Sequence, residues 1–131
     1  MLFTILTNDI SRDIISLYDI TKGDTKSLVN TKLNRYLPLT EAAYYILLSL
    51  REPLHGYGVM LKVEKMSRGA ISIGPGTLYG AFATLEREKL IAFVREDERR
   101  RVYQITEKGE QVLDLYIERL GMMLSNAGKL N

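Results

Sequence analysis

The sequence predicts a mainly α-helical protein that carries one small β-hairpin. Apolar residues recur at helical spacing through most of the chain, alternate as in strands between residues 90 and 106, and then return to helical spacing. These changes of period divide the chain into an N-terminal extension over 1–37, a main domain over 38–106 and a C-terminal helix over 107–128.

The composition is that of an ordinary folded protein. The chain has 131 residues, 46% of them hydrophobic and 26% charged, which suits one domain with an appendage. There is no cysteine, so disulfides and thiolate chemistry are excluded. Without a convincing signal peptide or an apolar run of bilayer length, we expect a cytoplasmic protein with no membrane partner.

The residues that carry most enzyme chemistry are scarce. The chain has one histidine, no cluster of metal ligands and no phosphate-loop motif. We therefore expect no catalytic residue, no metal site and no cofactor. The net charge of +2 gives weak support to a polyanionic partner, because the position of the charges decides binding.

Residues 1–37 differ in pattern from the rest of the chain. The stretches "NDISRDIISLYDI" and "LVNTKLNRYL" place apolar residues near helical spacing, and the turn-forming "TKGDTKS" separates them. They predict two short helices. These helices could pack on the main domain or join an interface between two copies of the chain.

Two helices open the main domain. Thr40 is placed to cap "EAAYYILLSLRE", which stops before a proline. The turn "PLHGYG" leads into a second helix, "YGVMLKVEKMS". We expect His55 to cap or pack in this turn and Tyr57 to lie in the core. The buried side of the second helix is predicted to hold Val59, Met60, Val63 and Met66.

The third helix begins at "GPG". Gly74 suits the cap and Pro75 the first helical position, where its missing N–H group costs nothing. Gly80 lies in the interior and costs roughly 1 kcal/mol relative to alanine, which close approach of another surface would explain. The predicted buried stripe holds Leu78, Ala81, Phe82 and Leu85. The opposite face holds Thr77, Gly80, Ala83, Thr84 and Arg87, with Tyr79 at its edge.

The stretches "LIAFVRE" and "RVYQIT" alternate as the two strands of a hairpin. Between them the acidic run "EDE" is followed by Arg99, Arg100 and Arg101. Because side chains alternate along a strand, the three arginines are not expected to face one way, and one of them could pair with the acidic run.

Thr106 is placed to cap the last helix, "EKGEQVLDLYIERLGMMLSNAG". Its apolar stripe must fold back on the core, pack on the N-terminal extension or meet a partner chain. The stripe consists of Val112, Leu113, Tyr116, Ile117, Leu120, Met123 and Leu124.

The order of three helices, a hairpin and a helix is that of a helix-turn-helix followed by a charged wing. Residues 38–109 resemble the PadR family of bacterial transcription regulators, which are winged helix-turn-helix proteins. The resemblance rests on "PLHGYGVMLKVEK" at 53–65, "IGPGTLYGAFATLEREKLI" at 73–91 and "RRVYQITEKG" at 100–109. These motifs have the family's order and spacing over more than half of the chain.

The resemblance implies a homodimer that pairs through the stripe of the C-terminal helix. It also implies binding to double-stranded operator DNA, commonly as a repressor and often with release by a small-molecule effector. Three features depart from the family pattern. Gly80 replaces a larger side chain, the wing turn lacks a glycine, and residues 1–37 are an addition to the family core.

The start of the third helix would hold a phosphate through the free N–H groups at Gly76 and Thr77. Tyr79 could donate its phenol to a phosphate or pack against the hairpin. Gly80 could let the helix lie deep in a major groove or serve a helix contact within a dimer.

Base reading would then fall to Thr84 and Arg87, with much of the affinity coming from phosphate contacts and DNA shape. The wing arginines at 99–101 would follow the DNA backbone or enter a minor groove. The alternative function is a winged-helix adaptor that binds proteins without specific DNA binding. Three adjacent cations on the hairpin argue against that alternative.

Overall fold

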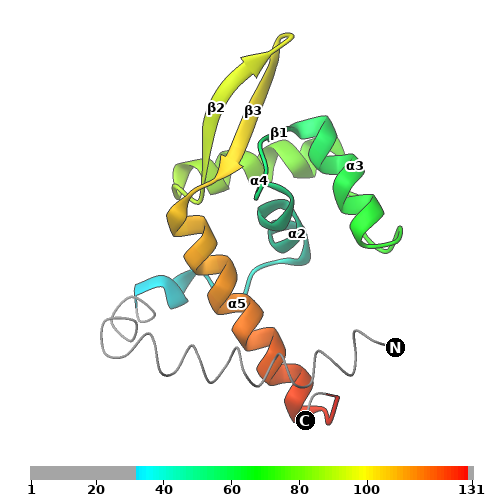
Figure 1. The fold of residues 1–131 in the computed structure, drawn as a ribbon, viewed down its shortest axis with the longest axis vertical. Helices are drawn as coiled ribbons and strands as arrows, with labels where there is room; N and C mark the ends of the chain where they lie inside the picture. The colour runs from blue at the N-terminus through cyan, green and yellow to red at the C-terminus, as the bar shows by residue number, and fades with distance from the viewer. Residues whose placement is uncertain (1–31, 130–131) are drawn as a thin grey trace. The chain divides into compact units, whose positions relative to one another are not determined.

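The computed structural model describes residues 32–129, which fall into two compact units (Figure 1). One unit comprises Pro38–Leu113, and the other described residues, 32–37 and 114–129, belong to a second. The first helix predicted for the N-terminal extension lies outside the described residues. Of the second, only its end is described, where a short 3-10 helix η1 (Asn34–Tyr36) forms.

The main unit has the predicted fold class. Its helices are α2 (Glu41–Ser49), α3 (Gly56–Met66) and α4 (Pro75–Arg87), and α5 (Glu107–Asn126) begins in it. The hairpin consists of β2 (Ile91–Asp97) and β3 (Arg100–Ile105). In the part of the chain that the structure describes, no helix is long and apolar enough to cross a membrane.

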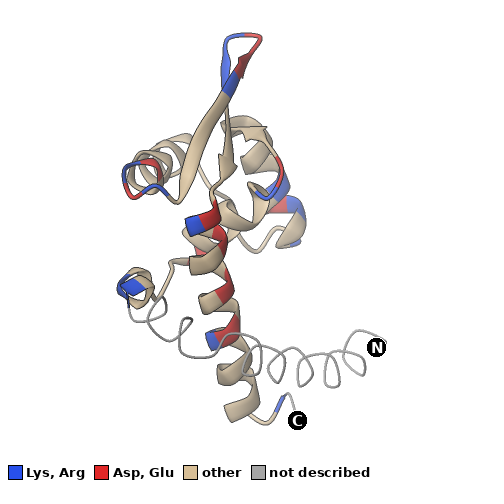
Figure 2. Ribbon diagram, turned by 60° about the vertical axis from the view of Figure 1, so that its left-hand side comes forward, with Lys and Arg blue, Asp and Glu red and all other residues tan. Residues whose placement is uncertain are grey.

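Side-chain caps begin the helices where the sequence predicts them. The Oγ1 atom of Thr40 accepts a hydrogen bond of 3.0 Å from the N–H of Ala43, and that of Thr106 accepts one of 3.0 Å from Gly109. Pro75 follows the capping Gly74 at the start of α4. Acidic residues occupy the first turn of α5, at the positive end of its dipole (Figure 2).

A third strand, which the sequence analysis assigned to a turn, completes the sheet. β1 (Leu54–His55) pairs antiparallel with β3, so that Leu54 lies opposite Tyr103 and His55 opposite Val102. The strand order is β1-β3-β2, which makes β3 the central strand. Two residues are too few to show an alternating pattern, so this strand could not be predicted from the sequence and is recognised only by its pairing with β3.

The core of this unit lies between the helices and the sheet. Phe82 and Tyr103 meet edge to face, with ring centroids 5.1 Å apart. The fully buried apolar residues of the unit, each at most 2% exposed, are Ile46, Leu47, Leu50, Val59, Val63, Leu78, Leu90, Ile91, Val102, Val112 and Leu113. The predicted stripe of α4 is confirmed, with Ala81 half-buried beside Leu78, Phe82 and Leu85.

The prediction that Tyr57 lies in the core is wrong, since its side chain is 52% exposed. Val59 and Val63 face the core, and a residue two positions before Val59 points about 200° around the helix from it. Met66, the last residue of α3, is also exposed, and Met60 is half-buried. The buried side of α3 is therefore narrower than the sequence suggests.

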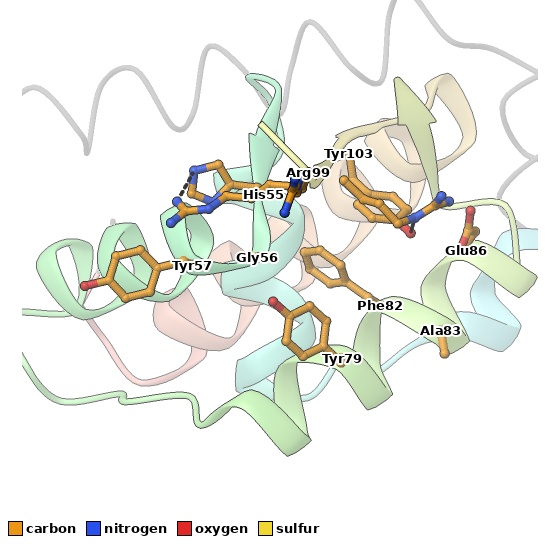
Figure 3. Close-up of a pocket in the computed structure, with 11 residues that line it drawn as sticks. His55, Gly56, Tyr57, Tyr79, Phe82, Ala83, Glu86, Arg99 and Tyr103 are labelled. Carbon is orange, nitrogen blue, oxygen red and sulfur yellow. Dashed lines mark hydrogen bonds between the residues drawn. The ribbon is translucent and has the colours of Figure 1, made fainter. Parts of the chain in front are cut away.

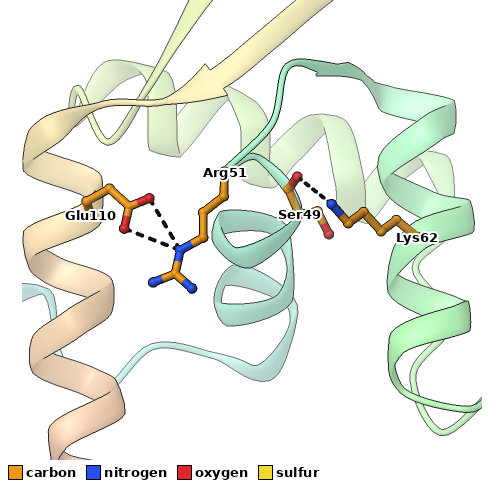
Figure 4. A network of polar contacts seen from close by, with 4 residues as sticks. All are labelled: Ser49, Arg51, Lys62 and Glu110. Atoms are coloured by element: carbon orange, nitrogen blue, oxygen red, sulfur yellow. Dashed lines mark hydrogen bonds and ion pairs between the residues drawn. The ribbon is translucent and has the colours of Figure 1, made fainter. Parts of the chain in front are cut away.

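Polar contacts of Arg51 and Lys62 tie the helices of this unit together (Figure 4). Nε of Arg51, just after α2, lies 3.3 Å from the carboxylate of Glu110 at the start of α5. Nζ of Lys62 on α3 lies 3.1 Å from Glu52 and donates to the carbonyl oxygen of Ser49 at the end of α2. A cation there satisfies an unpaired carbonyl and suits the negative end of the helix. Lys62 therefore has a structural role.

Gly109 marks the closest approach between α5 and the chain that enters β2. A Cβ atom placed on it would collide with the carbonyl oxygen of Leu90, which accepts a hydrogen bond of 3.0 Å from Thr106. It would also lie 2.7 Å from a side-chain carbon of Ile105. Only glycine fits between these groups, so this residue fixes how α5 leaves the sheet.

Replacing Gly109 with alanine should lower the free energy of unfolding by about 1–3 kcal/mol, because the obstructing atom belongs to the backbone and cannot rotate away. Urea unfolding followed by circular dichroism measures the change. Gly121→Ala in the same helix is the control, since nothing lies within 4 Å of a Cβ there. It should raise stability by up to about 1 kcal/mol, and equal effects of the two changes would contradict the prediction.

Candidate nucleic-acid interface

The outer face of α4 has almost no protruding side chains. The predicted residues Gly76, Thr77, Gly80, Thr84 and Arg87 are all exposed on it, together with Ala83. A Cβ atom at Gly76 or Gly80 would have no neighbour within 4 Å. Within the described residues, no contact inside the chain therefore requires glycine at position 80. The guanidinium of Arg87 lies 3.4 Å from the hydroxyl of Thr84 one turn earlier.

The wing ends in a two-residue turn formed by Glu98 and Arg99. Both have positive φ, at 48° and 68°, as in the turns whose twist matches that of the flanking strands. The turn is usually built with Asn and Gly, so two larger side chains accept a strained backbone here. The turn is therefore a tight two-residue turn although it contains no glycine. Acidic and basic residues follow one another along the chain at this tip (Figure 2).

Arg101 lies against the aromatic side of the hairpin. Its Nε donates a hydrogen bond of 3.0 Å to the hydroxyl of Tyr103, and its guanidinium lies 4.2 Å from the ring centroid of Phe93. The hydrogen bond to Tyr103 raises the pKa of Arg101 further above its ordinary value. These contacts hold the guanidinium in place, and an arginine in a protein stays charged.

Arg100 has different neighbours from those of Arg101. Its Nη1 lies 3.3 Å from Nε2 of His55, and its guanidinium is 5.9 Å from the ring centroid of Tyr57. Opposite Arg100 in the register is Asp97, whose carboxylate instead pairs with Nε of Arg95 at 2.9 Å.

None of the three predicted wing arginines forms an ion pair with any residue of the described stretch 32–129. The proposed pairing of one of them with the neighbouring acidic run is therefore not observed in this part of the chain. Their positive charge remains available to a partner.

A cleft of about 560 Å³ lies where the wing, α4 and the start of α3 converge (Figure 3). It is lined by residues of α4 and of the wing that were predicted to bind DNA, together with aromatic side chains that border the core. The residues that line it are His55, Gly56, Tyr57, Tyr79, Phe82, Ala83, Glu86, Arg99, Arg100, Arg101 and Tyr103. All three wing arginines line this cleft, contrary to the expectation from strand alternation that they would not face one way. With Glu86 as the acidic residue among those lining it, the cleft favours an anion.

Tyr79 is 56% exposed and leans against α3 inside this cleft. A Cβ atom on Gly56 would lie 2.7 Å from its hydroxyl oxygen, and its ring meets that of Phe82 edge to face at 6.1 Å. The suggested packing of Tyr79 against the hairpin is replaced by packing over Gly56. Tyr79 thereby lines the cleft next to Gly56.

Several cleft residues were not singled out as site residues from the sequence. His55, Gly56 and Tyr57 belong to "PLHGYG", which reads locally as a turn, and Tyr103 reads as an ordinary strand residue. The available signal was the crowding of two glycines, a histidine and a tyrosine into six residues. That signal indicates close approach but does not indicate what approaches.

The predicted dimerisation stripe has two different environments. Val112 and Leu113 are fully buried in the chain itself, so their side chains are not available to a second copy. Ile117, Met123 and Leu124 are exposed, by 37%, 56% and 48% respectively. Tyr116 and Leu120 are intermediate.

A helix-turn-helix whose last helix presents a bare face beside an arginine-bearing hairpin defines a winged helix-turn-helix protein. Residues 46–115, more than half of the chain, match the family described as "Transcriptional regulator PadR-like family". The chain belongs to this family.

Solved structures share the fold. A PadR family transcriptional regulator from Eggerthella lenta is 24% identical, with a TM-score of 0.56 over 92% of this chain and 94% of that chain. A PadR-like regulator from Bacillus cereus is 21% identical, with a TM-score of 0.57 over 72% and 93%. RosR of H. salinarum is 24% identical, with a TM-score of 0.54 over 70% and 79%.

A curated relative extends the comparison to a longer protein. The chain is 36% identical over 75 residues to a protein of Streptomyces fradiae named "Uncharacterized 37.1 kDa protein in transposon TN4556". The match covers 56% of this chain and 21% of that protein. The chain thus spans about a fifth of the length of this relative.

Gly56→Ala should displace the Tyr79 ring while preserving the fold, because the obstructing hydroxyl is the end of an exposed side chain. We expect a stability loss of roughly 1 kcal/mol, part of it from a closer contact with Leu78. Tyrosine ring resonances in NMR spectra report the displacement. In a Tyr79→Ala background only the contact with Leu78 should remain, and an unchanged Tyr79 resonance in Gly56→Ala would contradict the packing.

Proposed function

We propose that this chain is a sequence-specific DNA-binding transcriptional regulator that uses α4 and the wing to bind double-stranded operator DNA. The observation that carries the proposal is the bare outer face of α4 beside a cleft with three arginines that form no ion pair within the described residues. A helix with small outer residues can approach a surface closely, and the adjacent cations make a polyanion the matching surface.

Groove geometry favours α4 as the inserted helix. An α-helix with its side chains is about 10–12 Å across and the major groove is about 12 Å wide, so side-chain size decides how deeply the helix lies. Gly76, Gly80 and Ala83 leave α4 narrow on its exposed side. Such a helix would come within reach of the base edges with its backbone close to the DNA.

Phosphate contacts would hold this position. The free N–H groups at the start of α4, near Gly76 and Thr77, would bind one phosphate at the positive end of the helix. The phenol of Tyr79 would donate to another, and Arg99, Arg100 and Arg101 would follow the backbone along the wing. Each phosphate that a cation neutralises releases counterions and so increases affinity, and this contribution falls as the salt concentration rises.

Direct base reading would involve few residues. Thr84 and Arg87 already contact each other, so the pair would present one guanidinium and one methyl group to the groove. Arginine suits guanine, and a threonine methyl suits the thymine methyl. We infer modest direct readout, with DNA shape contributing much of the specificity.

A homodimer would double this interface on a symmetric operator. The exposed apolar residues Ile117, Met123 and Leu124 of α5 support pairing through that helix. Because Val112 and Leu113 are buried in the chain, we restrict the proposed interface to the later turns of the helix. In this proposal the dimer acts as a non-catalytic repressor that a small-molecule effector releases from DNA.

Replacing Arg99, Arg100 and Arg101 together with alanine should weaken DNA binding and reduce the slope of log affinity against log salt by up to about 2.7 for each bound subunit. Fluorescence anisotropy on DNA from upstream of the protein's own gene, titrated at several salt concentrations against random competitor, measures both. Lys65→Gln, at an exposed lysine of α3, is the control for loss of a cation outside the cleft. An unchanged salt slope in the triple variant would exclude the wing from the interface.

Gly80→Leu should abolish DNA binding while leaving the fold and oligomeric state intact, because the new side chain fills the space required by the groove. Nothing lies within 4 Å of a Cβ at this position, so the isolated chain can accept the change. Gly80→Ala is the smaller control and should raise stability by up to about 1 kcal/mol. Analytical ultracentrifugation separates the alternatives: loss of the dimer with Gly80→Leu would assign Gly80 to a helix contact between copies.

A further inference from the structure

His55 makes two contacts that constrain its proton. It caps α3, and its Nδ1 accepts a hydrogen bond of 3.1 Å from the backbone N–H of Gly58. A nitrogen that accepts from an N–H group carries no proton of its own. In the neutral imidazole the proton is therefore on Nε2, the atom that lies 3.3 Å from Nη1 of Arg100. Both residues line the cleft.

The contact between His55 and Arg100 is consequently a meeting of two donors. Nε2 of His55 carries a proton, and the guanidinium of Arg100 has donors and no acceptor. The two nitrogens are 3.3 Å apart, which is close to hydrogen-bonding distance. Because both nitrogens carry protons, neither can accept a hydrogen bond from the other. An oxygen acceptor placed against both groups would satisfy both.

The surroundings of this pair favour a negatively charged acceptor. Arg100 also lies over the ring of Tyr57 at 5.9 Å, and Arg99 lines the same cleft. Glu86, the one carboxylate among the described residues that line the cleft, lies on the far side of it from His55 (Figure 3). The first turn of α3 follows His55 directly, and the positive end of its dipole adds to the local field.

We propose that His55 and Arg100 together bind one phosphate of the DNA backbone. This inference rests on the proposed function and adds a contact from β1, outside the helix-turn-helix and the wing. Nε2 of His55 donates a neutral hydrogen bond, and Arg100 contributes the charge. The cap at Nδ1 fixes both the direction of the ring and the position of the proton.

The first test is the tautomer, which NMR reads without ambiguity because the chain has a single histidine. Full-length protein labelled with ¹⁵N-histidine should show a protonated Nε2 and an unprotonated Nδ1. Adding operator DNA should shift the Nε2 proton. The opposite tautomer in the free protein, or an Nε2 signal that DNA leaves unchanged, would overturn the proposal.

The second test separates the phosphate contact from the cap. His55→Asn keeps a side-chain oxygen that can cap α3 but removes the distant N–H group. It should weaken DNA binding by about three- to tenfold and leave the salt slope unchanged, because a neutral donor releases no counterion. Arg100→Gln should weaken binding and also reduce the slope by about 0.9 for each bound subunit. In the double variant the losses should not add, because the groups share one phosphate.

Stability and ligand controls complete the experiment. The melting temperature of His55→Asn should remain near that of the unmodified protein, so that loss of binding is not loss of fold. Wild-type affinity in His55→Asn, or an equal response of Nε2 to inorganic phosphate and to DNA, would overturn the assignment to DNA. If the unmodified protein itself fails to bind DNA, the proposed function fails. If that protein binds and His55→Asn binds equally well, only the present inference fails.

Discussion

The pairing of β3 with strands on both of its sides is the constraint on which the cleft depends. Val102 and Tyr103 are buried in the middle of the sheet, bonded to β1 on one edge and to β2 on the other. β1 leads directly into α3, so this pairing brings the start of α3 next to the wing. Without β1 the hairpin would be anchored through the ends of its own strands, and His55 would have no fixed relation to Arg100.

The two faces of α4 have different roles: the buried face stabilises the fold, and the exposed face determines the shape of the surface. Leu78, Phe82 and Leu85 are at most 5% exposed and bind the helix to the core. Burying side chains of this size contributes about 1.5–3 kcal/mol each, which exceeds the roughly 1 kcal/mol that Gly80 costs in the helix. The outer face can therefore remain bare without loss of the helix. The loss of stability caused by the small residues of the outer face is offset by the packing of the buried face.

The wing keeps its cations available by local arrangement. Asp97 lies opposite Arg100 in the register, but its carboxylate pairs with Arg95 on its own strand. The tight turn at Glu98 and Arg99 adopts positive φ at both residues, so two strained residues reverse the chain in the least length. Arg101 is fixed by Phe93 and Tyr103, which keeps one charge at a defined place.

The sequence by itself determined the helices, the hairpin, the caps at Thr40 and Thr106 and the bare face of α4, because period and cap chemistry are local properties. It also pointed to the wing arginines. Only the tertiary structure decided that "PLHGYG" contains a strand, that Tyr57 is exposed and that Gly56 makes room for Tyr79. These features depend on residues far apart in the chain, and a two-residue strand or a glycine contact has no periodic signature. The same reason explains why Val112 and Leu113, alike in sequence to the rest of their stripe, are buried inside the chain.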